Sequence, residues 1–121
     1  MRALRSFGRE AGDAYRPVNN LSNDASNIRR IDVYRRAGAR LFTIETEIRA
    51  LTVPNELGTA HRLMTRFISS TRRTYENAAN HLEEGGGADV SADVQTSFAR
   101  AVQFYRAAYD ELDGFEPRTC A

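Results

Sequence analysis

The sequence LGTAHRLMTRFISSTRRTYENAANHL, at residues 57–82, decides the fold class of this chain. The members of one stripe recur there at alternating steps of four and three residues: Leu57, His61, Met64, Ile68, Thr71, Tyr75, Ala78 and Leu82. This spacing places them on one face of an α-helix, whereas residues on one face of a strand recur at every second position. Asn55 after Pro54 is a candidate N-cap and Gly85 a candidate stop, so the stretch predicts a helix of about thirty residues.

Two other stretches carry the same helical spacing. The first follows Asp89 or Ser91 as a candidate cap and ends at Gly114. Its stripe consists of Val94, Phe98, Ala101, Tyr105, Ala108 and Leu112. The second ends just before Pro54, and its stripe consists of Tyr34, Ala37, Leu41, Ile44, Ile48 and Leu51. Both stretches predict long helices.

The start of the helix that ends before Pro54 has two alternatives. Its stripe changes phase, because Ile28 and Tyr34 are six residues apart where a heptad repeat needs seven. The helix over residues 18–51 therefore either curves or breaks. Asparagine, serine and aspartate are concentrated at residues 19–27, and these residue types favour caps and turns. A break around residues 23–27 stays open beside a continuous helix.

Residues 1–17 predict a separate N-terminal element. Leu4, Phe7, Ala11 and Ala14 form a short amphipathic stripe, which two glycines weaken. Three long helices with short connections must pack antiparallel to bury their stripes. We therefore expect an all-α fold, an antiparallel up-down-up three-helix bundle over residues 18–114. Residues 1–17 would be a basic arm or a short fourth helix, and residues 115–121 a C-terminal tail.

Formal charge is unevenly distributed along the chain. All seventeen basic residues are arginine; residues 1–73 carry fourteen of them against seven acids, and residues 74–121 carry three against nine. The predicted bundle would bring two groups of opposite charges together. The first group is Arg29, Arg30, Arg35 and Arg36 with Glu83, Glu84, Asp89 and Asp93, and the second is Arg49, Arg62 and Arg66 with Asp110, Glu111 and Asp113. Such pairing would cancel most of the positive field, so we do not expect a nucleic-acid partner.

The N-terminal arm is the exception to this pairing, because few acids lie near its arginines in the sequence. Its candidate partner-docking residues are Arg2, Arg5, Phe7, Arg9 and Arg16. A basic amphipathic segment can bind a partner protein or lie on an anionic membrane surface. The alternative is a terminus that is frayed or folds back on the bundle.

No spacing in the sequence is typical of a catalytic or metal-binding site. Di-iron bundle enzymes need a Glu-x-x-His spacing, and the residues three before His61 and His81 are glycine and alanine. The chain also lacks a Cys-x-x-Cys-His haem signature, a Gly-x-x-x-x-Gly-Lys phosphate loop and a nucleophile elbow. We therefore expect a protein that is not an enzyme, with no catalytic residues, no cofactor and no metal.

His61 lies on the apolar stripe one turn into its helix. A neutral imidazole there is expected to pack in the core and to bond a neighbouring carbonyl or hydroxyl. Tyr75 and Tyr105 also fall on core stripes, where their rings are expected to pack and their hydroxyls to reach the bundle edge. The alternative role of His61, Tyr75 and Tyr105 is contact with a small ligand.

The chain has 121 residues, of which 41% are hydrophobic, and this is enough for one domain with its own core. Its single cysteine, Cys120, cannot form an internal disulfide. No apolar run approaches the roughly 20 residues that span a bilayer, and the N-terminus lacks the apolar centre of a secretory signal. The compartment stays open: the cytoplasm if Met1 is the native start, or the cell envelope or exterior if a signal peptide has been removed.

Four segments of the chain resemble those of an uncharacterised helical-bundle domain of bacterial secreted proteins and lipoproteins: RALTVP, NELGTAHRLM, AANHLEEG and FARAVQFYRAAYDEL. In that domain a helix ends in a Leu-x-x-Leu-x-x-Pro-like signature, which precedes a His-x-x-Leu-like step. Leu51, Pro54 and His61 match these motifs, and Met64 takes the place of the downstream leucine. The resemblance spans residues 34–113 and implies a non-enzymatic sensor or scaffold.

Two functions stand as predictions. The first is a non-enzymatic structural or protein-interaction module, such as a small accessory subunit of a larger assembly. It rests on the bundle, the lack of catalytic spacing and the basic arm. The second is an extracytoplasmic helical-bundle domain that binds a small ligand or a lipid, which rests on the resemblance and on His61 with its neighbouring tyrosines.

Overall fold

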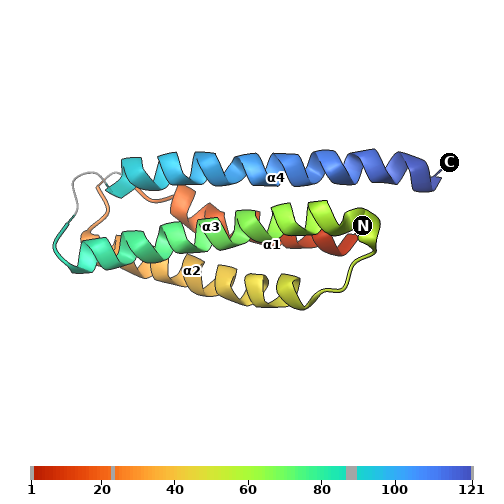
Figure 1. The fold of residues 1–121 in the computed structure, drawn as a ribbon. Helices are drawn as coiled ribbons and strands as arrows, with labels where there is room; N and C mark the ends of the chain where they lie inside the picture. The colour runs from red at the N-terminus through yellow and green to blue at the C-terminus, as the bar shows by residue number, and fades with distance from the viewer. Residues whose placement is uncertain (1, 23, 87–89, 121) are drawn as a thin grey trace.

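The structure, a computed structural model, describes residues 2–22, 24–86 and 90–120, with side chains described as far as Gly114. Its elements are α1 (Arg2–Asn19), α2 (Asn27–Ala50), the short 3-10 helix η1 (Asn55–Leu57), α3 (Gly58–Glu83) and α4 (Val90–Cys120). In Figure 1 the four long helices lie along one another, and each runs opposite to the one before it in the chain. The described residues contain no strand, so the all-α prediction is confirmed.

The N-terminal segment is a full helix of the bundle and not an arm. Its buried positions are Leu4, Gly8, Ala11, Ala14 and Val18. A Cβ atom on Gly8 would lie 3.0 Å from the Tyr105 ring and 3.2 Å from the Met64 methyl group, so this glycine leaves room for these two side chains against α1. The helix continues through Pro17 in its last turn, so α1 spans the boundary between residues 17 and 18 that the sequence suggested.

The chain breaks between α1 and α2, as the second alternative predicted, and a continuous helix over residues 18–51 is wrong. The side chain of Ser26 caps α2 by accepting a hydrogen bond from the backbone N–H of Arg29 at 3.1 Å. This satisfies one of the donors that a helix leaves open at its N-terminus. The phase change between Ile28 and Tyr34 therefore marks the first turns of a new helix.

Helix ends agree with the sequence at Gly85 and differ elsewhere, because Asn55 lies in η1 and α3 begins at Gly58 with no side-chain cap. Gly85 follows α3 with a φ of +90°, a conformation that favours glycine, so the predicted stop is confirmed. Gly114, however, lies inside α4, which continues to Cys120 through most of the predicted tail. An internal glycine costs a helix only about 1 kcal/mol, so it does not by itself end one. The candidate cap Asp89 lies outside the described residues, and Ser91 is already helical.

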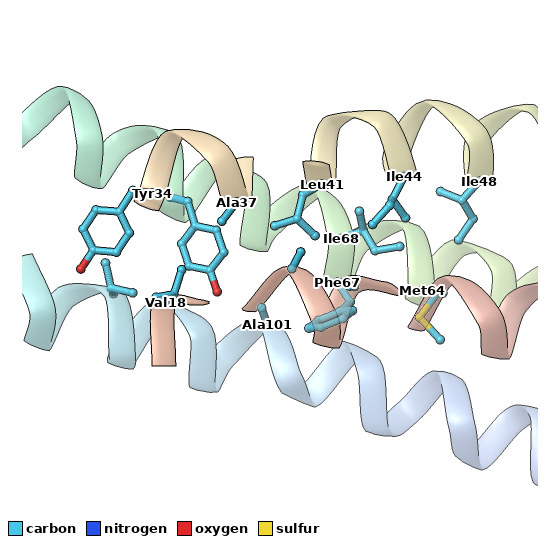
Figure 2. Packing of buried hydrophobic residues seen from close by; sticks show 14 of the residues in the cluster. Val18, Tyr34, Ala37, Leu41, Ile44, Ile48, Met64, Phe67, Ile68 and Ala101 are labelled. Atoms are coloured by element: carbon cyan, nitrogen blue, oxygen red, sulfur yellow. The ribbon is translucent and has the colours of Figure 1, made fainter. Parts of the chain in front are cut away.

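The predicted stripes form the core between the helices. Figure 2 shows Leu41, Ile44 and Ile48 of α2 directed toward Ile68 and Met64 of α3. Several of the largest core side chains are completely inaccessible to solvent: Leu4, Leu41, Ile48, Met64, Ile68 and Tyr75. None of the described helices is both long and apolar enough to cross a membrane.

Candidate functional site

The five candidate docking residues of the N-terminal segment do not form a free amphipathic surface. Phe7 is half-buried against the core, on the apolar side of α1. Arg5 forms an ion pair with Asp113 of α4 at 2.7 Å, and its guanidinium group lies 5.0 Å from the centre of the Tyr109 ring. The remaining arginines of this helix are exposed: Arg2, Arg9 and Arg16. The apolar half of the segment is therefore used inside the bundle, and only a charged half faces outward.

Tyr75 and Tyr105 pack in the core at separate places. Tyr75 is completely buried beside Tyr34, with ring centres 6.1 Å apart, and its hydroxyl has no hydrogen-bond partner among the described residues. Burial, with the nearby Tyr15 and Tyr34, raises the pKa of Tyr75 above the range of an ordinary phenol. The prediction that this hydroxyl reaches the bundle edge is wrong, because the helices cover it.

Tyr105 packs against Phe67 and Tyr109, at ring-centre distances of 5.1 and 4.6 Å. Burial, together with a hydrogen bond and the charge of Tyr109, raises the pKa of Tyr105 to about 12, although Arg5 acts to lower it. Among the main cavities of the described part of the chain, His61 lines one, and Tyr75 and Tyr105 line none. None of these cavities would therefore let one ligand touch all three residues.

His61 bridges α3 to the end of α2. Its Nε2–H group donates a hydrogen bond to the backbone carbonyl of Ile48 at 2.6 Å, and the ring is half-buried. This is the bond expected of a packing histidine. The Ile48 carbonyl, in the last turn of α2, also accepts the backbone N–H of Leu51 at 3.2 Å, so the imidazole is its second donor. The bond to Ile48 also fixes the neutral imidazole in the tautomer that carries its proton on Nε2.

A groove on the outer face of α3, which we call the arginine groove, collects positive charge. It has a volume of about 650 Å³ and is lined by Arg49, His61, Arg62, Thr65, Arg66, Ser69, Ser70 and Arg73. All but Arg49 lie on α3, at the three- and four-residue steps that put side chains on one helix face. None of the lining residues is an acid.

Three arginines of this groove are held in place by uncharged partners. Arg62 donates a hydrogen bond to the Thr59 hydroxyl at 3.1 Å, and Arg73 donates one to the Ser69 hydroxyl at 3.2 Å. The guanidinium group of Arg66 stacks over the Phe104 ring, 4.6 Å from its centre. Among the residues that the structure describes, none of the three arginines forms an ion pair with a carboxylate. Their charge is therefore positioned but not neutralised.

The serine hydroxyls of the groove differ from the threonine hydroxyls of α3, one of which, Thr65, also lines the groove. Thr65, Thr71 and Thr74 each donate their proton to the backbone carbonyl four residues earlier, at 2.8–2.9 Å. Ser69 accepts a bond from Arg73, and neither Ser69 nor Ser70 donates to an acceptor in the described part of the chain. The half-buried Ser70 O–H group between Arg66 and Arg73 is thus available to a ligand, while the buried Ser69 oxygen holds Arg73.

A buried ion-pair cluster borders the groove on the side of α2. Glu45 is 8% exposed and accepts hydrogen bonds from Arg72 at 2.5 Å and from Arg49 at 3.1 Å, while Arg72 also binds Glu76 at 2.8 Å. Burial acts to raise the pKa of Glu45, but the hydrogen bonds and positive charge of Arg72 and Arg49 outweigh it and hold that pKa below its ordinary value. This cluster fastens α2 to α3.

The predicted charge pairs are correct in part among the residues that the structure describes. Arg35 binds Glu83 at 2.7 Å as predicted, whereas Arg36 binds Asp32 within its own helix. At the other end the prediction is wrong, because Arg49 binds Glu45 and Arg5 takes Asp113. The prediction left α1 out of the bundle. Because Arg5 of α1 reaches Asp113, this acid does not pair with the arginines of α2 and α3.

The sequence contains a pattern that indicates the arginine groove, but the predicted pairing with acids of α4 assigned Arg62 and Arg66 to other partners. Arg62, Arg66 and Arg73, with Ser69 and Ser70, follow helical spacing on the side of α3 away from its apolar stripe. Among the described residues, no three histidine, cysteine, aspartate or glutamate side chains lie close enough to hold a metal ion. Comparisons with protein families, with curated proteins and with solved structures find no match to this chain.

Proposed function

We propose that this chain is a non-enzymatic protein-interaction module that binds an acidic partner through the arginine groove. The observation that carries this proposal is the group of Arg62, Arg66 and Arg73, which uncharged neighbours hold in place without neutralising them. A carboxylate or other anion supplied by a partner would complete their charge-assisted hydrogen bonds, which are the stronger kind. A small subunit of a larger assembly would use such a surface.

The surroundings of the groove also suit a protein partner. Phe42 of α2 is 58% exposed, and the guanidinium group of Arg72 lies 5.9 Å from the centre of its ring. Arg72 belongs to the ion-pair cluster that borders the groove, so the exposed ring lies on the same α2–α3 side of the bundle. Aromatic and arginine side chains are enriched where proteins bind one another.

Docking through the N-terminal segment remains the competing hypothesis for the same function. Its remaining contribution is the charge of Arg2, Arg9 and Arg16, because the apolar side of α1 packs on the bundle. Arg16 already pairs with Asp13 at 2.8 Å. We therefore place the interaction surface on α3.

Paired charge reversals separate the two surfaces. The variant Arg62→Glu/Arg66→Glu alters the groove, and Arg2→Glu/Arg9→Glu makes the same change of net charge on α1. Both variants and the wild type are tagged and used to capture partners from native extract, with cross-linking, stoichiometry and salt dependence measured for each. We expect a stoichiometric partner that the α3 variant loses and the α1 variant keeps. Loss with the α1 variant alone would move the surface to α1, and no stoichiometric partner with any form would contradict the proposed function.

A further inference from the structure

We propose that the arginine groove recognises a phosphoryl group, carried by a phosphorylated side chain of the partner protein. This inference rests on the proposed function and deepens it by naming the chemistry of the contact. It starts from the donors that line the groove and from the way in which they are held.

Most side chains that line the groove keep a hydrogen-bond donor for a ligand, whereas His61 and Thr65 already donate to the backbone carbonyls of Ile48 and His61. The set contains four guanidinium groups, one imidazole and three hydroxyls, with no carboxylate and no amide. A phosphoryl group carries a charge of about −1.5 to −2 and three strong acceptor oxygens, whereas a carboxylate carries one charge and two oxygens. A lining without carboxylates, in which no carboxylate of the described residues pairs with three of the guanidinium groups, therefore matches a phosphoryl group better than a carboxylate.

The arrangement along α3 places hydroxyls between charges. Ser69 and Ser70 lie three or four residues from both Arg66 and Arg73, which are about 10 Å apart along the helix axis. A single tetrahedral anion above these serines would have a guanidinium group on each side. Arg62 extends the positive charge by one more turn toward the start of α3, whereas the fourth guanidinium of the lining, Arg49 of α2, is already paired with Glu45.

Two guanidinium groups of the groove are oriented before a ligand binds. Stacking on Phe104 orients Arg66, and the Ser69 hydroxyl orients Arg73. Ser69 is 4% exposed, so the oxygen that holds Arg73 is buried, while Arg73 itself is exposed. Arginine suits this role because its planar group binds phosphate through two parallel hydrogen bonds. Arginine clusters of this kind recognise phosphorylated motifs.

The charge distribution favours one phosphoryl group over a polynucleotide. The chain has a formal net charge of only +1, and outside the groove Arg5, Arg16, Arg35 and Arg36 are paired with carboxylates. A nucleic-acid strand needs a continuous positive track along its backbone. The positive charge without carboxylates that we find on α3 covers about three turns of helix.

Nuclear magnetic resonance titration of the full-length protein tests this inference. The probes are inorganic phosphate, sodium acetate, three short peptides that differ only in carrying phosphoserine, glutamate or serine, and a single-stranded oligonucleotide, all at constant ionic strength. We expect saturable shifts at Ser69, Ser70 and the arginine Nε–H groups of the groove. The phosphoserine peptide should bind at least tenfold more tightly than the glutamate peptide.

Matched variants complete the test. Arg66→Gln/Arg73→Gln should weaken phosphoserine binding at least tenfold, Ser70→Ala should weaken it severalfold, and the control Arg2→Gln/Arg9→Gln should leave it unchanged. Equal binding of the glutamate and phosphoserine peptides, shifts spread over α1, or tighter binding of the oligonucleotide would each overturn the inference. If these results occur while Arg62→Glu/Arg66→Glu still abolishes partner capture, the proposed function stands with a carboxylate partner, so the two failures are distinguishable.

Discussion

Arg72 and Arg73 are adjacent in the sequence, yet α3 directs them to two regions with opposite roles. About 100° of helical rotation separates them. Arg72 lies at the α2–α3 interface, where Glu45 and Glu76 neutralise it. Arg73 lies in the arginine groove, where a serine hydroxyl holds it and no carboxylate of the described chain reaches it. The partner of an arginine, more than its place in the sequence, decides whether its charge fastens the fold or remains available for binding.

The ion-pair cluster should be the more important region for stability. Replacing Glu45 by glutamine removes the carboxylate that two arginines bind, and leaves Arg72, whose side chain is 18% exposed, with Glu76 alone. We expect the free energy of unfolding in urea to fall by about 2–3 kcal/mol. The control Asp32→Asn breaks an exposed pair with Arg36 and should cost less than about 0.5 kcal/mol. Equal losses from both variants would show that burial of the cluster does not matter.

The stabilisation by the ion-pair cluster should depend on pH through the charge of Glu45. The pKa of Glu45 is lower in the folded protein than in the unfolded chain, so the unfolded state binds a proton more readily. The stabilisation is therefore complete above the unfolded pKa and is lost as the pH falls through the folded one. Urea unfolding at pH 6 and pH 3 should show the difference between wild type and Glu45→Gln shrinking toward the lower pH. A difference that stays constant would mean that the charge of Glu45 contributes nothing.

The groove should contribute almost nothing to stability. The double variant Arg62→Gln/Arg66→Gln removes two charges that have no carboxylate partner among the described residues, and it relieves repulsion between them. We expect its free energy of unfolding to stay within about 0.5 kcal/mol of wild type. A loss of 2 kcal/mol or more in urea would mean that these arginines hold the fold together, and the contrast between the two regions would disappear.

The sequence predicted the helical class and most of the core, because a buried helix face requires its apolar residues at three- and four-residue steps. The stripes of α2, α3 and α4 follow that spacing, and Met64 and Ile68 are fully buried as expected. The N-terminal helix was harder to predict, since glycine lowers helix propensity. Gly8 is favourable there because it leaves room for the Tyr105 and Met64 side chains, and the spacing of residues in the sequence does not reveal this contact.

The candidate site was less predictable than the fold. The arginines of α3 were assigned to acids of α4, and such an assignment depends on which helices become neighbours. Because α1 packs beside α4, Arg5 takes Asp113, and the groove keeps its charge. His61 was assigned to the core, and its bond to the Ile48 carbonyl fits that role, but its place on the rim of the groove needed the α2–α3 packing.

The most direct test of this contrast compares Arg72→Gln with Arg73→Gln, the same substitution at adjacent residues. Urea unfolding and phosphoserine-peptide binding are measured on both. We predict that Arg72→Gln loses about 2 kcal/mol of stability and keeps its binding, while Arg73→Gln keeps its stability within about 0.5 kcal/mol and binds at least tenfold more weakly. If Arg73→Gln binds as tightly as wild type, or if both variants lose the same stability, the separation of fastening and binding arginines is contradicted.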